Sequence, residues 1–226
     1  MPKESGKSGQ QSREIKPEDM PQEAWEMYEA GLADEEKGRL ANAEEKYEKA
    51  VQIHPAFEAC WLNLALVQQN QGDLLKSIVT SKRALEHLPN SSQIWCNLGT
   101  FYLQIERMEE KAESAFRKAL ELEPNFTVVM VNLGMLLAKQ GDIEGAEMYL
   151  SRSRVTAYER EDGSESKEFT SRVWAEIAVL RAVLGKSNGV QMACIAALEA
   201  DDTSPFVLER ISLARSIIDD KEKENS

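Results

Sequence analysis

The chain has 226 residues, 42% of them apolar and 29% charged, and this length is enough to bury a substantial core. Its formal net charge of −12 opposes binding to nucleic-acid phosphates or anionic lipid, because like charges repel. No apolar run approaches the roughly 20 residues that span a bilayer, and the N-terminal segment lacks the apolar core of a signal peptide. We therefore expect a cytoplasmic protein with no nucleic-acid partner and no direct membrane insertion.

The first 20 residues are polar and predict a disordered N-terminal tail. From there the chain repeats itself. Two sets of residues recur with spacings of 34 and 35, namely Pro55, Pro89 and Pro124, and Trp61, Trp95 and Met130. A period of this length is typical of a stacked array in which each repeat is one supersecondary unit.

The repeat spacing sets the domain boundaries. Residues 21–203 form the array, with repeats at about 24–57, 58–92, 93–126, 127–160 and 171–203. The fifth repeat begins with Trp174 but lacks a terminal proline, and the acidic insertion at 159–168 predicts a solvated loop before it. Residues 204–218 continue the apolar pattern with Leu208 and Ile211 and predict a capping helix, and we expect a disordered tail at 219–226.

The third repeat shows the residue pattern most completely. It reads Trp95-x-x-Leu98-Gly99-x-x-Tyr102, followed by Ala112, Phe116 and Pro124. This pattern resembles the tetratricopeptide repeat family, whose unit is a helix-turn-helix. The resemblance implies an all-α fold, a right-handed superhelical solenoid with a C-terminal capping helix, in which the first helices of the repeats line a concave groove.

Each recurring residue has a physical reason. Two helices cross closely only where a side chain is small, and small residues recur at Gly31, Ala65, Gly99, Gly134 and Ala178. The pairs Gly72-Asp73 and Gly141-Asp142 predict a left-handed helix end followed by a capping carboxylate. The large apolar side chains of Trp61, Trp95 and Trp174 are expected to be covered by neighbouring helices.

No pattern in the sequence indicates catalysis or a cofactor. The two histidines, His54 and His87, lie near the ends of second helices, where they can meet terminal carbonyls. The sequence has no phosphate-binding loop, no nucleophile elbow and no metal-ligand spacing. Cys60, Cys96 and Cys194 are odd in number and form no CxxC, so we expect small core residues and no metal site. The prediction is a non-enzyme with no cofactor.

A row of polar residues is the main candidate for a binding site. One residue per repeat stands two positions after the recurring aromatic residue or its equivalent, at Glu29, Asn63, Asn97, Asn132 and Glu176. An amide offers a donor and an acceptor, so it can bracket the backbone of an extended peptide. The row is similar to the peptide-gripping asparagines in the repeat arm of O-GlcNAc transferase. The alternative is that these asparagines only hold neighbouring repeats together.

Apolar and small residues accompany this row on the same side of the first helices. They are Tyr28, Leu62, Cys96 and Val131 beside it, and Leu66, Thr100 and Met135 one turn on. Core packing would bury some of them, and those left exposed would form an apolar interaction surface. We therefore include all seven with the row in the candidate peptide-binding groove.

The chemistry of the groove restricts its ligand. Family members that bind the acidic tails of heat-shock chaperones use a clamp of Lys, Asn and Arg, and only Asn63 matches it here. Residues 21–57 carry 9 acids and 4 bases, whereas residues 58–92 carry 3 of each. The sequence predicts a monomeric adaptor that binds an extended segment or helix of a protein partner. The alternatives are a self-assembling scaffold and an assembly chaperone that shields an apolar subunit.

Overall fold

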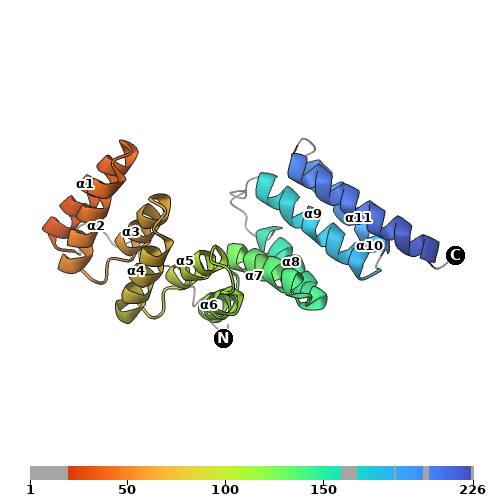
Figure 1. Cartoon of the computed structure of the whole chain (residues 1–226), viewed down its shortest axis with the longest axis horizontal. Coiled ribbons are helices and arrows are strands. Elements are labelled where there is room, and N and C mark those ends of the chain that lie inside the picture. The colour runs from red at the N-terminus through yellow and green to blue at the C-terminus, as the bar shows by residue number, and fades with distance from the viewer. Residues whose placement is uncertain (1–19, 159–166, 186, 201–203, 225–226) are drawn as a thin grey trace, which may run out of the picture. The chain divides into compact units, whose positions relative to one another are not determined.

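The computed structural model describes residues 20–158, 167–185, 187–200 and 204–224, which contain eleven α-helices and no strand (Figure 1). They form two compact units that divide between Leu88 and Pro89. The first unit contains α1 (Gln22–Glu36), α2 (Leu40–Ile53), α3 (Glu58–Asn70) and α4 (Leu74–His87). The second contains α5 (Ser92–Leu103), α6 (Glu109–Leu122), α7 (Thr127–Gln140), α8 (Ile143–Tyr158), α9 (Lys167–Val183), α10 (Ser187–Ala200) and α11 (Pro205–Glu224). The predicted all-α fold of consecutive helix pairs is confirmed.

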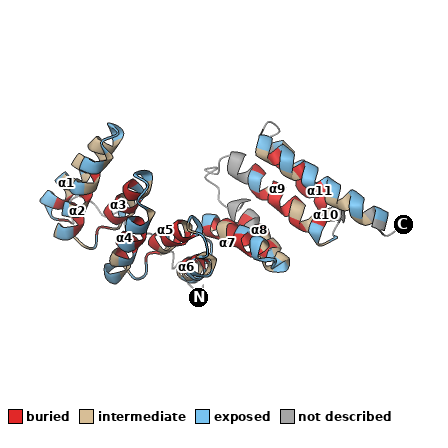
Figure 2. Cartoon of the chain, in the orientation of Figure 1, coloured by how far each residue is buried: buried red, intermediate tan, exposed pale blue. Residues whose placement is uncertain are grey.

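In the α1–α2 and α5–α6 pairs, a glycine of the first helix faces an aromatic residue of the second. Gly31 of α1 lies against the ring of Tyr47 on α2, and a methyl group at Gly99 of α5 would lie 2.6 Å from Cε1 of Phe116 on α6. Tyr47 and Phe116 are both fully buried. Buried residues alternate with exposed ones along the helices (Figure 2). A larger residue at either glycine would therefore push the two helices apart.

The Gly-Asp turns have the predicted geometry. Gly72 and Gly141 adopt φ angles of 84° and 88°, the left-handed conformation that glycine adopts without strain. Asp73 and Asp142 each accept a hydrogen bond from the backbone N–H three residues on, at 3.1 Å and 3.0 Å. The carboxylates thereby satisfy a free N–H group at the start of α4 and α8.

Trp61 of α3 is the tryptophan that best fits the expectation of a covered core residue. Its side chain is 3% exposed, its ring stacks on His87 at 6.2 Å, and the Arg83 guanidinium lies 5.2 Å from the ring centroid. Its indole N–H also donates to the Pro55 carbonyl at 2.9 Å. The second helix α4 thus covers a residue of the first helix of the same repeat.

The other two repeat tryptophans are less covered than expected. Trp95 and Trp174 are half-buried, and Trp95 makes the corresponding hydrogen bond to the Pro89 carbonyl at 3.0 Å. Lys118, at the position that corresponds to Arg83, pairs with Glu121 at 2.9 Å. Trp61 is therefore covered almost completely, and Trp95 and Trp174 are covered in part.

The three cysteines are buried and unpaired, as expected of small core residues. Burial raises the pKa of the Cys96 thiol to about 11 and also raises the pKa of Cys60 and Cys194. These thiols are therefore protonated at neutral pH, and their burial makes them poor nucleophiles.

In the first unit, a polar cluster around Glu44 connects the first and second repeats. The Glu44 carboxylate of α2 accepts hydrogen bonds from Gln68 of α3 and from Gln71, the residue after α3, each at 3.0 Å. It also forms an ion pair with Lys76 of α4. Burial alone would raise the pKa of Glu44, but the hydrogen bonds from Lys76 and the two glutamines outweigh burial and lower it. One carboxylate therefore joins three helices.

The C-terminal helix is longer than the predicted cap. It continues through residues 219–224, where a disordered tail was expected. The last turns are held by the Lys221 ammonium, which donates to the Val183 carbonyl at the end of α9, and by the Lys223–Asp220 ion pair at 3.4 Å. The N-terminal tail up to residue 19 and residues 159–166 of the insertion lie outside the described residues.

No helix in the described ranges combines the length and the apolar character that a membrane span requires.

Candidate functional site

The candidate site lies on the first helices of the repeats, α1 and α3 in the first unit and α5, α7 and α9 in the second. The predicted asparagine row comprises Glu29, Asn63, Asn97, Asn132 and Glu176, one residue on each of these helices. The exposure and hydrogen bonds of these five side chains decide what each can offer a ligand.

In the first unit, the row connects two repeats. The Asn63 side-chain amide on α3 donates a hydrogen bond to the Tyr28 hydroxyl on α1 at 3.1 Å. Tyr28 is half-buried, and its ring packs 4.7 Å from that of Phe57. Burial raises the pKa of Tyr28, so the hydroxyl stays protonated and neutral at neutral pH. One N–H donor of the Asn63 amide is therefore already used in a hydrogen bond that holds α3 against α1.

The surface beside this contact is apolar with one acidic residue. Leu66 is 38% exposed, Leu62 is half-buried, and Glu29 is exposed on α1. Glu29 makes no hydrogen bond or ion pair to another residue of the described ranges. The first unit can therefore offer an apolar contact and a free carboxylate to a basic or neutral ligand.

In the second unit, two asparagines of the row keep their hydrogen-bonding groups available. Asn97 of α5 and Asn132 of α7 are half-buried, and neither side chain hydrogen-bonds to another residue that the structure describes. Each amide thus presents two N–H donors and a carbonyl acceptor. Partial burial limits their rotation, which lowers the entropy lost when such a side chain grips a peptide backbone.

The residues that flank these two asparagines differ in what they offer. Met135 is 38% exposed on α7 and can pack against an apolar side chain of a ligand. Thr100 is half-buried, and its hydroxyl donates to the Cys96 carbonyl at 3.0 Å. Cys96 and Val131, included in the predicted groove, are 7% and 9% exposed and offer little contact surface.

The Glu176 side chain of α9 interacts with the C-terminal helix of the same chain. It is 9% exposed, and its carboxylate accepts a hydrogen bond from Arg210 of α11 at 2.8 Å. Arg172 and Arg210 also lie over the Phe206 ring, at 4.8 Å and 5.6 Å from its centroid. The row position of the fifth repeat therefore fixes the C-terminal helix instead of facing a ligand.

Two partners in these contacts were missed in the sequence. Tyr28 was predicted only as part of a set of apolar and small residues, and Arg210 was not among the predicted site residues. The available signal was spacing, because Arg210 follows Glu176 by 34 residues, the repeat period. No comparable signal pointed to Tyr28, whose hydroxyl reaches the next repeat only in the folded chain.

Within the described ranges, no group of three or more His, Cys, Asp and Glu side chains is arranged to bind a metal ion.

Comparison with known proteins places these features in a family. The model of the "Cilia and flagella-associated protein 70 middle TPR-like domain" matches residues 76–200, more than half of the chain. Protein O-mannosyl-transferase TMTC3 of Homo sapiens is 24% identical over 115 residues, which are 51% of this chain and 13% of that protein. TPR repeat-containing protein YvcD of Bacillus subtilis is 28% identical over 127 residues, or 56% of this chain and 26% of that protein. The chain thus spans about a quarter or less of either relative.

Solved structures support the same fold. A tetratricopeptide repeat protein from Parabacteroides merdae superposes with a TM-score of 0.70 at 18% identity, covering 90% of this chain and 76% of that one. YrrB, described as a TPR protein with an unusual peptide-binding site, superposes with a TM-score of 0.62 at 16% identity. That match covers 85% of this chain and 94% of YrrB. Likeness at this level of identity establishes the fold.

Proposed function

The chain belongs to the tetratricopeptide repeat family with the Cilia and flagella-associated protein 70 middle TPR-like domain, and on that premise we propose that it is a non-enzymatic adaptor that grips an extended protein segment. The observation that carries the proposal is the pair Asn97 and Asn132 in the second unit. Both amides are held by partial burial, and neither is used by another residue in the described ranges.

The two amides suit a peptide backbone better than a particular side chain. A backbone presents an N–H donor and a carbonyl acceptor at every non-proline residue, and an asparagine can bond to both. Met135 beside Asn132 would contact an apolar side chain of the same segment. Affinity would then come from hydrogen bonds to the main chain of an extended ligand. Specificity would depend on which alternate side chains of the ligand point toward the apolar residues of the site.

The charge distribution favours a ligand with an apolar or neutral centre. The first unit has a candidate surface of its own, the exposed Glu29 carboxylate of α1 with Leu62 and Leu66 of α3. At this surface a cationic residue of a ligand would be attracted to Glu29, whereas an acidic tail would be repelled. YrrB, which shares the fold, is described as having a peptide-binding site, and this supports a peptide as the class of ligand. The transferase activity in the name of TMTC3 is not part of the proposal, because the match covers 13% of that protein.

A selection experiment tests the proposal without a known partner. A random peptide library displayed on phage would be panned on the full chain, with counter-selection on the double variant Asn97→Ala/Asn132→Ala. We expect peptides with an apolar residue near their centre that bind the wild type and not the double variant. The matched control is Asn42→Ala/Asn125→Ala, two exposed asparagines outside the first helices, which should bind the same peptides as the wild type.

Two results would overturn the adaptor. If no selected peptide bound the wild type more tightly than the double variant, the two amides would not have the role assigned to them. Light scattering that shows growth of the wild-type chain into large assemblies with concentration would favour the self-assembling scaffold instead.

A further inference from the structure

The first helix of the chain, α1, carries six carboxylates and no Lys or Arg side chain. Three of these carboxylates are used within the first unit, by an ion pair to Arg39 and by hydrogen bonds from Gln22 and Tyr47. The other three have no partner in the described part of the chain, and they are Glu23, Glu29 and Glu36. No basic residue of its own helix can therefore neutralise the acidic groups of α1.

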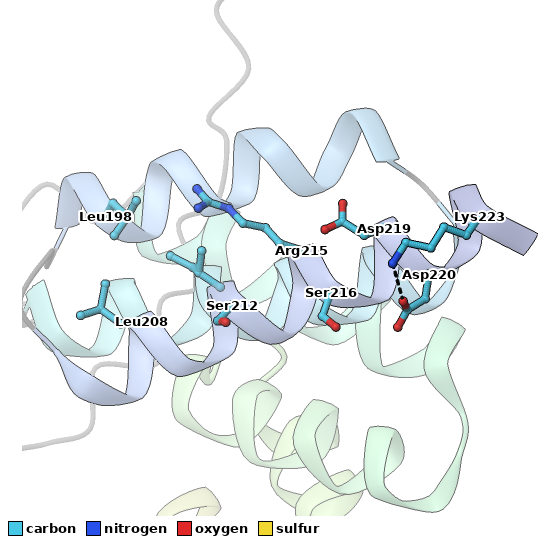
Figure 3. A pocket seen from close by; sticks show the side chains of 9 residues that line it. Leu198, Leu208, Ser212, Arg215, Ser216, Asp219, Asp220 and Lys223 are labelled. Carbon is cyan, nitrogen blue, oxygen red and sulfur yellow. Dashed lines mark hydrogen bonds and ion pairs between the residues drawn. The ribbon is translucent and has the colours of Figure 1, made fainter.

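The acidic residues of the C-terminal helix differ in this respect. They line a cleft of about 420 Å³ between α10 and α11, together with basic residues of the same helix (Figure 3). Lys223 pairs with Asp220 at 3.4 Å, and Arg215 lies one turn before Asp219. The acidic residues of α1 lack the neighbouring cations that α11 supplies within its own sequence.

Four side chains form one side of α1, called the α1 face below. They are Trp25, Glu29, Leu32 and Glu36, at spacings of four, three and four residues. Residues at these spacings lie side by side on a helix. Glu29 and Glu36 are exposed, and Trp25 and Leu32 are half-buried. The α1 face thus alternates an apolar side chain with a carboxylate.

The α1 face occupies repeat positions that stay open inside the array. The corresponding residues of α7 follow by 103 positions and are Val128, Asn132, Met135 and Lys139. Val128 is 47% exposed, Met135 is 38% exposed, and Lys139 is exposed, although further repeats lie before and after α7 in the chain. The accessibility of the α1 face therefore does not depend on what precedes α1.

The first unit contains an arginine that binds an aromatic ring and a carboxylate together. The Arg83 guanidinium donates to the Glu48 carboxylate at 3.0 Å and lies 5.2 Å from the centroid of the Trp61 ring. A planar guanidinium can do both at once, because its N–H groups point outward in the plane and leave its face free to stack. A ring and a carboxylate placed together thus form a site for a guanidinium.

The second unit repeats this combination, and α1 presents it without the cation. Arg210 donates to Glu176 at 2.8 Å and lies 5.6 Å from the centroid of the Phe206 ring. On the α1 face, Trp25 and Glu29 lie one turn apart, and no cation of the described residues lies over the Trp25 ring. The α1 face therefore has the ring and the carboxylate of the other two sites, and its cation would have to come from a ligand.

We propose that the α1 face binds an arginine side chain in an extended segment of a partner protein. The guanidinium would donate to the Glu29 carboxylate and lie over the Trp25 ring, which stacks on Phe57 with the ring centroids 6.2 Å apart. This assignment rests on the adaptor function and names the residue that the first unit takes. Lysine fits less well, because its ammonium has no flat face and is more strongly hydrated.

Leu32 specifies a second side chain of the ligand. At 1.5 Å per residue, Leu32 lies about 7.5 Å along the helix axis from the midpoint of Trp25 and Glu29. Side chains on the same side of an extended chain recur about every 6.8 Å. An apolar residue two positions from the arginine would therefore contact Leu32.

The test is an array of host peptides made of Ser, Thr and Gly, with every pair of amino acids at a central position and two positions on, probed with the fluorescently labelled full chain. We expect the strongest binding to peptides with Arg at the centre and Leu, Met or Phe two positions on. Glu29→Lys should weaken the binding of these peptides by about tenfold or more in anisotropy titrations. Trp25→Leu should remove the preference for Arg over Lys.

Glu23→Lys is the matched control, because Glu23 is exposed on α1 but lies about 120° around the helix from Glu29. It changes the net charge by the same amount as Glu29→Lys, and its affinity for the arginine peptides should stay within about twofold of the wild type. Both Lys variants should melt at the wild-type temperature, since neither carboxylate has a partner in the described ranges. Trp25→Leu is compared below its own melting temperature, because Trp25 is half-buried.

The outcomes separate the possible occupants. Equal binding of Arg, Lys and Gln peptides by the wild type, or equal losses in Glu29→Lys and Glu23→Lys, would overturn the proposal. Self-association of the wild-type chain that Glu29→Lys abolishes would assign the α1 face to a second copy. Arginine binding that begins only after deletion of residues 1–19 would assign the face to that segment. Asn97→Ala/Asn132→Ala should keep the arginine preference, so a failure of the paired amides and a failure of the α1 face give different results.

Discussion

The Asn63 side-chain amide donates to the Tyr28 hydroxyl at 3.1 Å, and this hydrogen bond joins the first helices of two successive repeats. Asn97 and Asn132 stand at the same repeat position, but neither side chain has a hydrogen-bond partner within the described ranges. One residue type at one repeat position thus stabilises repeat packing in the first unit and leaves its amide free in the second. The two roles can be tested separately.

Removal of the Asn63 amide should reduce stability. Asn63→Ala loses one half-buried hydrogen bond, so the free energy of unfolding should fall by about 0.5 to 1.5 kcal/mol. Tyr28→Phe removes the same bond from the other side, and the double variant should cost less than the sum of the two single changes. Urea denaturation of the four proteins measures this coupling. Strict additivity would show that the hydrogen bond contributes nothing to folding.

The two tryptophans should differ in their contribution to stability. Trp61→Ala removes a side chain that is 3% exposed and should cost about 3 to 5 kcal/mol. Trp95 is only half-buried, so Trp95→Ala should cost clearly less. Thermal melting followed by circular dichroism compares the two variants. If Trp95→Ala proved the more destabilising, the difference in burial would not govern the energetics.

The Glu44 cluster should make stability depend on pH. Because hydrogen bonds hold the folded-state pKa of Glu44 below its ordinary value of 4.5, its stabilisation is complete well above that value. It is lost as pH falls through the lowered pKa. At pH 7, Glu44→Gln should be less stable than the wild type by on the order of 1 to 3 kcal/mol. The difference should shrink below about pH 4 in urea titrations, and a constant difference from pH 7 to pH 3 would contradict this account.

Loss of the C-terminal helix should expose the fifth repeat. Val207, Ile211 and Ala214 of α11 are buried, so deletion of residues 204–226 uncovers the apolar surface on which they pack. The deletion also leaves the Glu176 carboxylate without Arg210. The truncated chain should bind a hydrophobic dye and aggregate, as measured by fluorescence and light scattering. A monomeric truncation of unaltered stability would show that α11 does not stabilise the array.

The repeat fold could be predicted because its rules are local. A glycine followed by an aspartate specifies a helix end and a cap within four residues, and Gly72-Asp73 folds as predicted. A small residue such as Gly99 likewise specifies where two helices cross, because any side chain would meet Phe116. These features depend on residues within one repeat, so spacing alone locates them.

The candidate site was less predictable because it depends on how far neighbouring helices cover each face. Helical spacing placed Val131 beside the asparagine row but did not indicate that it is buried. Spacing also could not reveal that Glu176 is taken by Arg210, since that contact requires α11 to pack along α9. Whether a residue on a predicted face is exposed is a property of the packed array.

The central claim is that Asn97 and Asn132 grip a peptide backbone, and the double variant Asn97→Ala/Asn132→Ala tests it most directly. Affinity for a selected peptide, by isothermal titration calorimetry, and melting temperature, by circular dichroism, should be measured on the same preparation. Two lost hydrogen bonds, together worth about 1 to 3 kcal/mol, predict affinity about fivefold to 150-fold weaker. Because both amides lack partners in the described ranges, the melting temperature should stay within about 2 °C. A variant that melts many degrees lower, yet binds with wild-type affinity where it is folded, would contradict the claim and assign both asparagines to repeat packing.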